Sequence, residues 1–268
     1  MQTNADHYGR AEEAAAAVRA RFGVERLDLA FVLGSGWSAA ADALGEEIGR
    51  CPLEELPHFA APVVLGHGGL LRLVRTRTGA VAAIFTGRTH LYEGRGVEPV
   101  VHGVRTAIRA GASVVVLTNG CGGLRREWAP GTPVLIADHI NLSGATPLTG
   151  PRFIDLTAVY APRLRAVARE VEPDLPEGVY VQFHGPQFET PAEVRMAGIL
   201  GGDLVGMSTT VEAVAARELG AEVLGISLVT NLAAGISPEP LNHQEVLEAG
   251  AAAAPRLTAL LGGLADRL

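Results

Sequence analysis

The sequence has 268 residues, of which 48% are hydrophobic, and a formal net charge of −7. This length suits one large α/β domain or two small ones. Because no Gly/Ser/Pro-rich linker and no internal repeat divides the chain, we expect a single domain over residues 1–268. The acidic balance, without any run of Lys or Arg, argues against a nucleic-acid polymer as partner.

The chain shows no targeting or membrane signal. The polar N-terminal stretch lacks the basic and apolar regions of a signal peptide, and the longest apolar runs fall far below the roughly 20 residues of a membrane span. The two cysteines, Cys51 and Cys121, have no metal-like or redox spacing, so we expect reduced, partly buried thiols. These features predict a soluble, cytoplasmic protein.

Predicted helices and strands alternate along the chain. The first half predicts a surface helix over 9–22, a strand, glycine turn and helix start over 27–45, a hairpin of 70–76 and 80–87, a helix over 99–112, and strands over 113–124 and 132–142. The second half predicts a helix over 191–202, a short strand and helix over 204–220, a strand over 222–235, and a C-terminal helix that Pro255 breaks or kinks. Several strands are apolar throughout, which predicts a three-layer α/β/α fold with a mixed central sheet.

Four of these strands end in small or polar residues. The endings are Gly34-Ser35-Gly36, Thr118-Asn119-Gly120, Met207-Ser208-Thr209 and Thr230-Asn231. In open α/β sheets, ligands bind beyond the carboxyl ends of the strands. The sequence therefore predicts a binding site built from these four endings.

The Gly34-Ser35-Gly36 turn is a candidate anion site, because unpaired N–H groups converge in such turns. A dinucleotide fits the G-x-G-x-x-A pattern of 34–39, but the acids about 20 residues on, Glu54 and Glu55, stand in a segment without a strand pattern. A nucleoside triphosphate would need a Lys-Ser/Thr pair, which is absent after the turn. Two interpretations of the turn remain: it binds free phosphate, or it binds no ligand.

The stretch GRTHLYEG favours phosphate. It places Arg88, His90 and Tyr92 at alternate positions, so an extended backbone would point the three side chains to one face. Arg supplies a planar fork of donors for phosphate oxygens, and His adds another donor. The alternative is a solvated loop that happens to contain an Arg.

Eight motifs then appear in a characteristic order. They are LGSG, GRTHLYEG, LTNGCGGL, ADHINL, HGPQFETPAE, VGMSTTVEA, SLVTN and NHQEVLEAG. From about residue 10 to the C-terminus the chain resembles the trimeric purine nucleoside phosphorylases, the family that also holds the methylthioadenosine phosphorylases. The resemblance implies a nucleoside phosphorylase-like fold, a cytoplasmic homotrimer, and reaction of a nucleoside with phosphate to give purine base and ribose 1-phosphate.

The resemblance implies that a phosphate ion is the nucleophile and co-substrate, with no other cofactor and no metal. The phosphate ligands would be Ser35, His67, Arg88, His90, Gly120 and Ser208. The family usually has Ala where Gly120 stands; the backbone donor survives this change, and we expect only a more flexible loop. Asn119 is expected to order the turn rather than to touch substrate.

For the purine, the resemblance implies that Asn231 donates to N7 and O6 as negative charge builds on the leaving base, and that Glu189 accepts from N1–H. Outside this family context, a turn residue and a solvated acid would be the ordinary interpretations of these two. Phe188 would stack on the base and Val205 would line its pocket. Together with His90, Asn231 and Glu189 form the predicted catalytic set.

For the ribose, the resemblance implies packing by Met207 and hydrogen bonds from Tyr92 to the 3′-hydroxyl and from His243 to the 5′-hydroxyl. The Asn before His243 is expected to cap the C-terminal helix. Phe153 of a neighbouring subunit would cover the sugar.

Because 6-aminopurine enzymes of the family usually carry Ser and Asp in place of Glu189 and Asn231, we expect inosine, guanosine and their 2′-deoxy forms as substrates, in purine salvage. Three alternatives stay open: a 6-aminopurine or methylthioadenosine phosphorylase, a nucleosidase, and a nucleoside-binding protein without catalysis.

Overall fold

The computed structural model describes residues 6–60, 69–237 and 241–268, although the side chains of Asp6 and His243 are not among the described atoms. Its α-helices are α1 (Asp6–Phe22), α2 (Glu98–Arg109), α3 (Pro162–Val171), α4 (Pro191–Ile199), α5 (Thr210–Glu218) and α6 (His243–Ala265). Short 3₁₀ helices are η1 (Ser38–Ala43), η2 (Leu53–Glu55) and η3 (Leu91–Glu93).

The strands form one mixed sheet. They are β1 (Leu29–Leu33), β2 (Glu46–Pro52), β3 (Leu70–Arg75), β4 (Val81–Thr86), β5 (Val114–Gly123), β6 (Pro133–Asn141), β7 (Glu177–Gln182), β8 (Leu204–Gly206) and β9 (Glu222–Leu232). Their order is β2-β3-β4-β1-β5-β8-β7-β6-β9, and β9 also pairs with β5. Strands β5, β8, β7, β6 and β9 therefore close into a ring, while β1 to β4 extend it as an open sheet.

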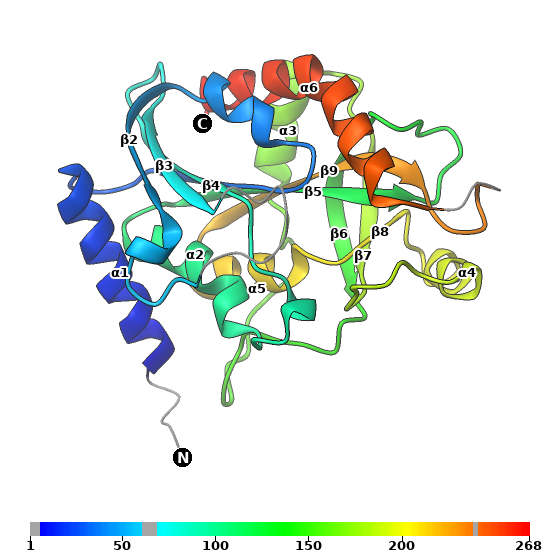
Figure 1. Cartoon of the computed structure of the whole chain (residues 1–268), viewed down its shortest axis with the longest axis horizontal. Helices are drawn as coiled ribbons and strands as arrows, with labels where there is room; N and C mark the ends of the chain where they lie inside the picture. Colours follow the sequence, from blue (N-terminus) through cyan, green and yellow to red (C-terminus); the bar gives the residue numbers. More distant parts are fainter. Residues whose placement is uncertain (1–5, 61–68, 238–240) are drawn as a thin grey trace.

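Helices cover the sheet on both sides (Figure 1). Helices α1, α2 and α5 pack together on one side, and α3, α6 and η1 on the other. The residues of β1 contribute to two hydrophobic cores, one on each face of the sheet. Ala30 and Val32 belong to one core, and Phe31 belongs to the other. Successive strand residues point to opposite faces, so a strand buried on both faces must be apolar at every position.

The structure confirms the predicted fold class and most of the predicted elements. The hairpin of β3 and β4 turns where Gly79 N donates to Thr76 O at 3.0 Å. Cys51 and Cys121 are buried free thiols, as expected. Within the described ranges, every helix is too short or too polar to cross a membrane.

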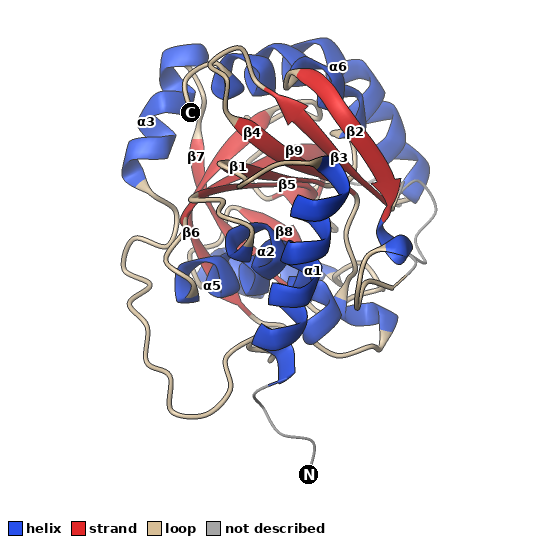
Figure 2. Ribbon diagram, turned by 90° about the vertical axis from the view of Figure 1, so that its left-hand side faces the viewer, coloured by secondary structure: helices blue, strands red, loops and turns tan. Residues whose placement is uncertain are grey.

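One expectation was wrong, and two strands and one α-helix were not predicted. No α-helix follows the Gly34-Ser35-Gly36 turn, because η1 is a 3₁₀ helix and β2 comes next. Strand β2 was not predicted, since its sequence EEIGRCP is mostly polar and only one of its residues is fully buried. The segment between β6 and α4 contains α3 and β7, which were also not predicted (Figure 2). Of the two outcomes expected at Pro255, a break or a kink, the break does not occur, since α6 runs from His243 to Ala265 with Pro255 inside it.

Candidate active site

A cavity of about 390 Å³ opens where the four predicted strand endings meet. Because β1, β4, β5 and β9 are parallel, their carboxyl ends lie on the same side of the sheet. Most of the predicted site residues line this cavity: Ser35, Arg88, His90, Tyr92, Gly120, Phe188, Glu189, Val205, Met207, Ser208 and Asn231. The site prediction thus agrees with the structure in where these side chains lie.

The glycine turn is a tight β-turn. Trp37 N donates to Gly34 O at 3.1 Å, and Gly36 at the third position has φ +84°, which favours glycine. The buried Trp37 ring donates to Asn119 O at 2.9 Å, and Gly34 N donates to Thr118 Oγ1 at 3.0 Å. The turn is therefore held against β5, with Ser35 facing the cavity.

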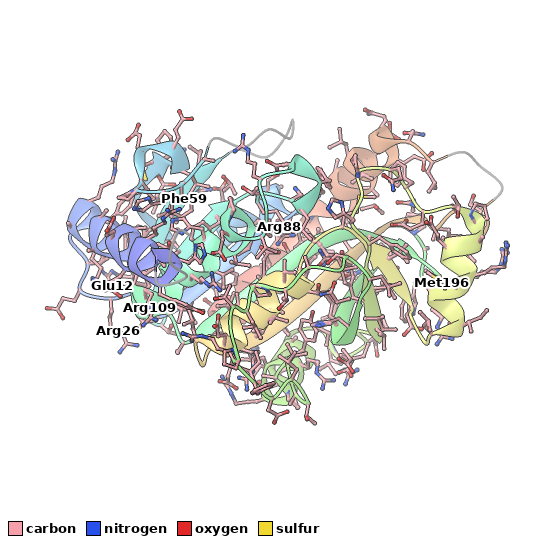
Figure 3. The ribbon with its side chains drawn as sticks, turned by 90° about the horizontal axis from the view of Figure 1, so that it is seen from below. Glu12, Arg26, Phe59, Arg88, Arg109 and Met196 are labelled. Atoms are coloured by element: carbon pink, nitrogen blue, oxygen red, sulfur yellow. The ribbon has the colours of Figure 1, made fainter. Side chains whose placement is uncertain are left out.

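Arg88 is buried, and its guanidinium is held by several groups at once. Nη1 donates to Thr118 O at 2.7 Å and to Ser208 Oγ at 3.1 Å, and Nε donates to Glu212 Oε1 at 3.3 Å. Figure 3 places Arg88 near the middle of the molecule. A buried guanidinium fixed in this way is suited to bind a small anion.

Ser208 lines the cavity, and the residues around it hold it in place. Thr209 Oγ1 accepts from Asn119 Nδ2 at 2.9 Å, so the Asn119 side chain holds the chain that carries Ser208. Burial raises the pKa of Glu212, and Arg88 offsets part of that effect. Ser208 N donates to the buried Tyr180 hydroxyl at 3.3 Å.

His90 and Tyr92 lie side by side, with ring centroids 4.6 Å apart and an interplanar angle of 12°. The predicted alternation along an extended backbone is wrong here, because residues 91–93 form η3. His90 N donates to Glu93 Oε1 at 2.8 Å, which closes this short helix. Burial raises the pKa of Tyr92 to about 12, so its hydroxyl stays protonated at neutral pH.

Tyr92 and Met207, the two predicted ribose contacts, come from distant parts of the chain and meet at Gly185. A Cβ added at Gly185, whose φ is +73°, would lie 2.5 Å from Met207 Sδ and 3.0 Å from Tyr92 Cδ1. This position therefore requires glycine.

At the other end of the cavity lie Glu189 and Asn231. Glu189 is 7% exposed, and its Oε1 has no hydrogen-bond partner among the described atoms. Burial raises the pKa of this carboxyl. Asn231 Oδ1 accepts from Thr230 Oγ1 at 2.9 Å, and Nδ2 donates to Leu232 O at 3.1 Å. The second N–H of Nδ2 is thus available to a ligand.

Strand β5 links the two ends of the cavity. A Cβ added at Gly120 would lie 3.5 Å from Ser35 Cβ, and Gly122 pairs with both Val205 and Asn231. Two strand residues span about 7 Å. The Ser35 turn and the Val205 and Asn231 pair therefore meet β5 about 7 Å apart.

Residues 28–265 match the model of the phosphorylase superfamily. The chain is 63% identical to a purine nucleoside phosphorylase of Cellulomonas sp. over 249 residues, covering 91% of this chain and 88% of that one. It is 53% identical over 257 residues to the enzyme of that name from Mycobacterium tuberculosis, with 96% of each chain covered. The structure of Schistosoma mansoni purine nucleoside phosphorylase with inosine superposes with a TM-score of 0.88 at 31% identity, covering 97% of this chain and 96% of that one. A structure of the Schistosoma mansoni protein with adenosine gives 0.88 and 31%, with 96% of each chain covered.

The chain belongs to the purine nucleoside phosphorylase family. This confirms the resemblance that the eight motifs indicated.

Three of the predicted site residues are not among the described residues that line the cavity. Phe153 is 95% exposed, on the long loop between β6 and α3. His67 lies outside the described residues. His243 begins α6, whose predicted cap is present because Glu245 N donates to Asn242 Oδ1 at 3.0 Å, but its side chain is outside the described atoms.

One residue beside the cavity, Glu212, was not among the predicted site residues. Thr230, which was expected only as part of a strand ending, lines the cavity, and its Oγ1 lies 2.9 Å from Asn231 Oδ1. Glu212 reaches Arg88 from α5, where it stands three residues after Thr209. The T-x-x-E spacing of a helix capping box was the available signal for Glu212.

Proposed function

We propose that this protein catalyses phosphorolysis of 6-oxopurine nucleosides, namely inosine, guanosine and their 2′-deoxy forms, as a step of purine salvage. Phosphate is the co-substrate, and the products are the free base and (deoxy)ribose 1-phosphate. The observation that supports this is the convergence, on one cavity, of the buried Arg88 with Ser208 at one end and of Glu189 with Asn231 at the other.

In this proposal, phosphate lies between the Ser35 turn and Arg88, with donors from His90, Ser208 and the N–H of Gly120. It attacks C1′ of the sugar as the bond from C1′ to N9 breaks. The charge of the ion is met by Arg88, and the chemistry calls on no metal or further cofactor. Tyr92 and Met207 hold the sugar between phosphate and base, as does His243.

The electrons of the breaking bond pass to the purine, so negative charge builds on N7 and O6. The Asn231 amide N–H donates to these atoms more strongly as that charge grows, which lowers the barrier. Glu189 accepts from N1–H, while Phe188 and Val205 contact the base. Glu189, Asn231 and His90 form the proposed catalytic set.

Selectivity rests on the same pair. An amide donor and a carboxylate acceptor match hypoxanthine and guanine, whereas adenine offers a 6-amino donor and an N1 without hydrogen. The Schistosoma mansoni relative has been solved both with inosine and with adenosine. An adenosine control is therefore part of the test for this chain.

We also propose a homotrimer that works in the cytoplasm. The exposed ring of Phe153 would cover the ribose of a neighbouring subunit. In this proposal the ligands of the reaction are a nucleoside and phosphate.

The test is hypoxanthine release from inosine by the purified protein, with and without phosphate, beside adenosine. Release that depends on phosphate, with little turnover of adenosine, is the expected result. Release without phosphate would indicate a nucleosidase instead. Equal turnover of adenosine would contradict the selectivity, and no release from either nucleoside would contradict catalysis.

A further inference from the structure

Glu212 connects two segments that carry proposed phosphate ligands. Its side chain is 1% exposed. Oε1 accepts from Arg88 Nε at 3.3 Å, and Oε2 accepts from Thr209 N at 3.0 Å. Because Ser208 precedes Thr209 and its Oγ lies 3.1 Å from Arg88 Nη1, these contacts form a closed ring, of which Arg88 and Ser208 line the cavity.

The backbone at Thr209 is strained. Its φ of +83° and ψ of −49°, with Thr210 N donating to Ser208 O at 3.0 Å, describe a γ-turn. A β-branched residue rarely adopts positive φ, and such a conformation persists only where the surroundings hold it. The Glu212 carboxylate and the Asn119 amide provide that hold.

Only a side chain with two acceptor atoms can satisfy both N–H donors. A glutamine of the same shape has one oxygen and one NH₂ group, so the NH₂ would face either Arg88 Nε–H or Thr209 N–H. One buried donor would then lose its partner, and the ring would open on that side.

We propose that Glu212 is a positioning residue for phosphate: it sets the guanidinium of Arg88 and the hydroxyl of Ser208 at the separation that the ion requires, without touching the ion. This inference rests on the proposed phosphorolysis. It predicts that removing one acceptor weakens phosphate binding selectively, while the nucleoside end of the cavity is unaffected.

The experiment compares Glu212→Gln with the unaltered protein. We expect the KM for phosphate to rise about tenfold or more, and the KM for inosine to change by less than about twofold. Glu218→Gln is the matched control for phosphate binding, because Glu218 is also buried on α5 and pairs with two arginines, Arg105 at 3.2 Å and Arg152 at 3.5 Å, away from the cavity. It should lower the Tm and leave the KM for phosphate unchanged.

Equal changes in both KM values, or the same rise in Glu218→Gln, would overturn the inference, since either would mean a general structural effect. Should Glu212→Gln fail to fold, Glu212→Asp keeps both acceptors on a shorter side chain and should show the same selective rise; unchanged kinetics would contradict the proposal. If the unaltered protein shows no phosphorolysis, the proposed function fails, and calorimetric titration with inorganic phosphate tests Glu212 separately. Equal phosphate affinity in the unaltered protein and the variant would then overturn the inference.

Discussion

Both polar atoms of the Asn231 amide have hydrogen-bond partners within the protein. Its Nδ2 donates to Leu232 O, and its Oδ1 lies 2.9 Å from the Thr230 hydroxyl, so the amide is held with its second N–H available to a ligand. Glu189 offers a buried carboxylate oxygen without a described partner. A ligand that leaves either group unpaired would lose affinity, since a buried polar group without a partner costs about 1–3 kcal/mol.

We expect Asn231→Asp to shift activity from inosine toward adenosine. The new carboxylate accepts from a 6-amino group but cannot donate to O6, so kcat/KM for inosine should fall by roughly 100-fold or more. The measurement is the ratio of kcat/KM for the two nucleosides. Asn141→Asp, an exposed position outside the cavity, is the control. Unchanged inosine turnover without any gain on adenosine would contradict the role assigned to Asn231.

At the scale of elements, the site depends on how closely β1 and β5 approach at their ends. A Cβ added at Gly34 would lie 2.6 Å from Thr118 O and 2.9 Å from Asn119 Cα, which no unstrained structure allows. The hydrogen bond that Gly34 N donates to the Thr118 hydroxyl holds the two strand ends at this distance. Because Gly34 has no side chain, the turn can approach β5 closely enough to place Ser35 beside it.

Gly34→Ala should force the two strand ends apart and destabilise the fold by about 1–3 kcal/mol, because overpacking a buried contact costs that much. Urea unfolding measures the effect, and phosphorolysis should fall with it. Gly9→Ala is the contrasting control: Gly9 lies in α1 with nothing within 4 Å of an added Cβ, so alanine should stabilise by roughly 0.5–1 kcal/mol. A Gly34→Ala protein of unchanged stability would show that the strand ends move freely.

For the whole molecule, acid stability depends on a buried histidine of α2. His102 is 7% exposed, its Nε2–H donates to Pro57 O at 3.1 Å, and burial lowers its pKa to about 4. In the unfolded chain the pKa is about 6.5. Between pH 6.5 and 4 the unfolded chain therefore binds more protons, so this group costs stability as the pH falls.

We expect His102→Gln to lose less stability on acidification than the unaltered protein. The amide can still donate to Pro57 O but does not titrate, so the loss between pH 7 and pH 5 should be smaller by about 2 kcal/mol. Urea unfolding at the two pH values measures it, with the exposed His184→Gln as control. The same pH dependence in His102→Gln and the unaltered protein would contradict this account.

The proposed trimer can be tested through the loop that carries Phe153. The loop is anchored where Arg105 Nη2 donates to Pro147 O at 2.7 Å, and Arg152 lies 3.5 Å from Glu218. Phe153 itself remains exposed. A large apolar ring on an anchored loop fits a contact with another subunit.

Phe153→Ala should raise the KM for inosine by about tenfold, the order of one lost aromatic contact. Subunits with Phe153→Ala, co-expressed with subunits carrying Asn231→Ala, should regain activity above the sum of the two variants measured alone. The reason is that one subunit supplies the intact cavity and its neighbour supplies the ring. Sedimentation should show three chains. No recovery in a mixture that sediments as a trimer would remove Phe153 from the site.

The local features could be predicted from the amino-acid sequence alone: the turn at Gly34-Ser35-Gly36, the hairpin at Gly79, the apolar strands and the polar residues that end them. These depend on turn chemistry and on periodicity over a few residues, which neighbouring positions largely decide. The order of the eight motifs was enough to indicate the family and most of the residues around the cavity.

The contacts between segments that are distant in the sequence could not be predicted and are known only from the three-dimensional structure. The polar strand β2, the ring that β9 closes with β5 and β6, and the contact of Glu212 with Arg88, 124 positions away, depend on packing of the whole sheet. The depth of burial, which raises the pKa of Glu189 and lowers that of His102, likewise comes from surrounding elements. No pattern in the local sequence encodes these contacts, because their partners lie far apart along the chain.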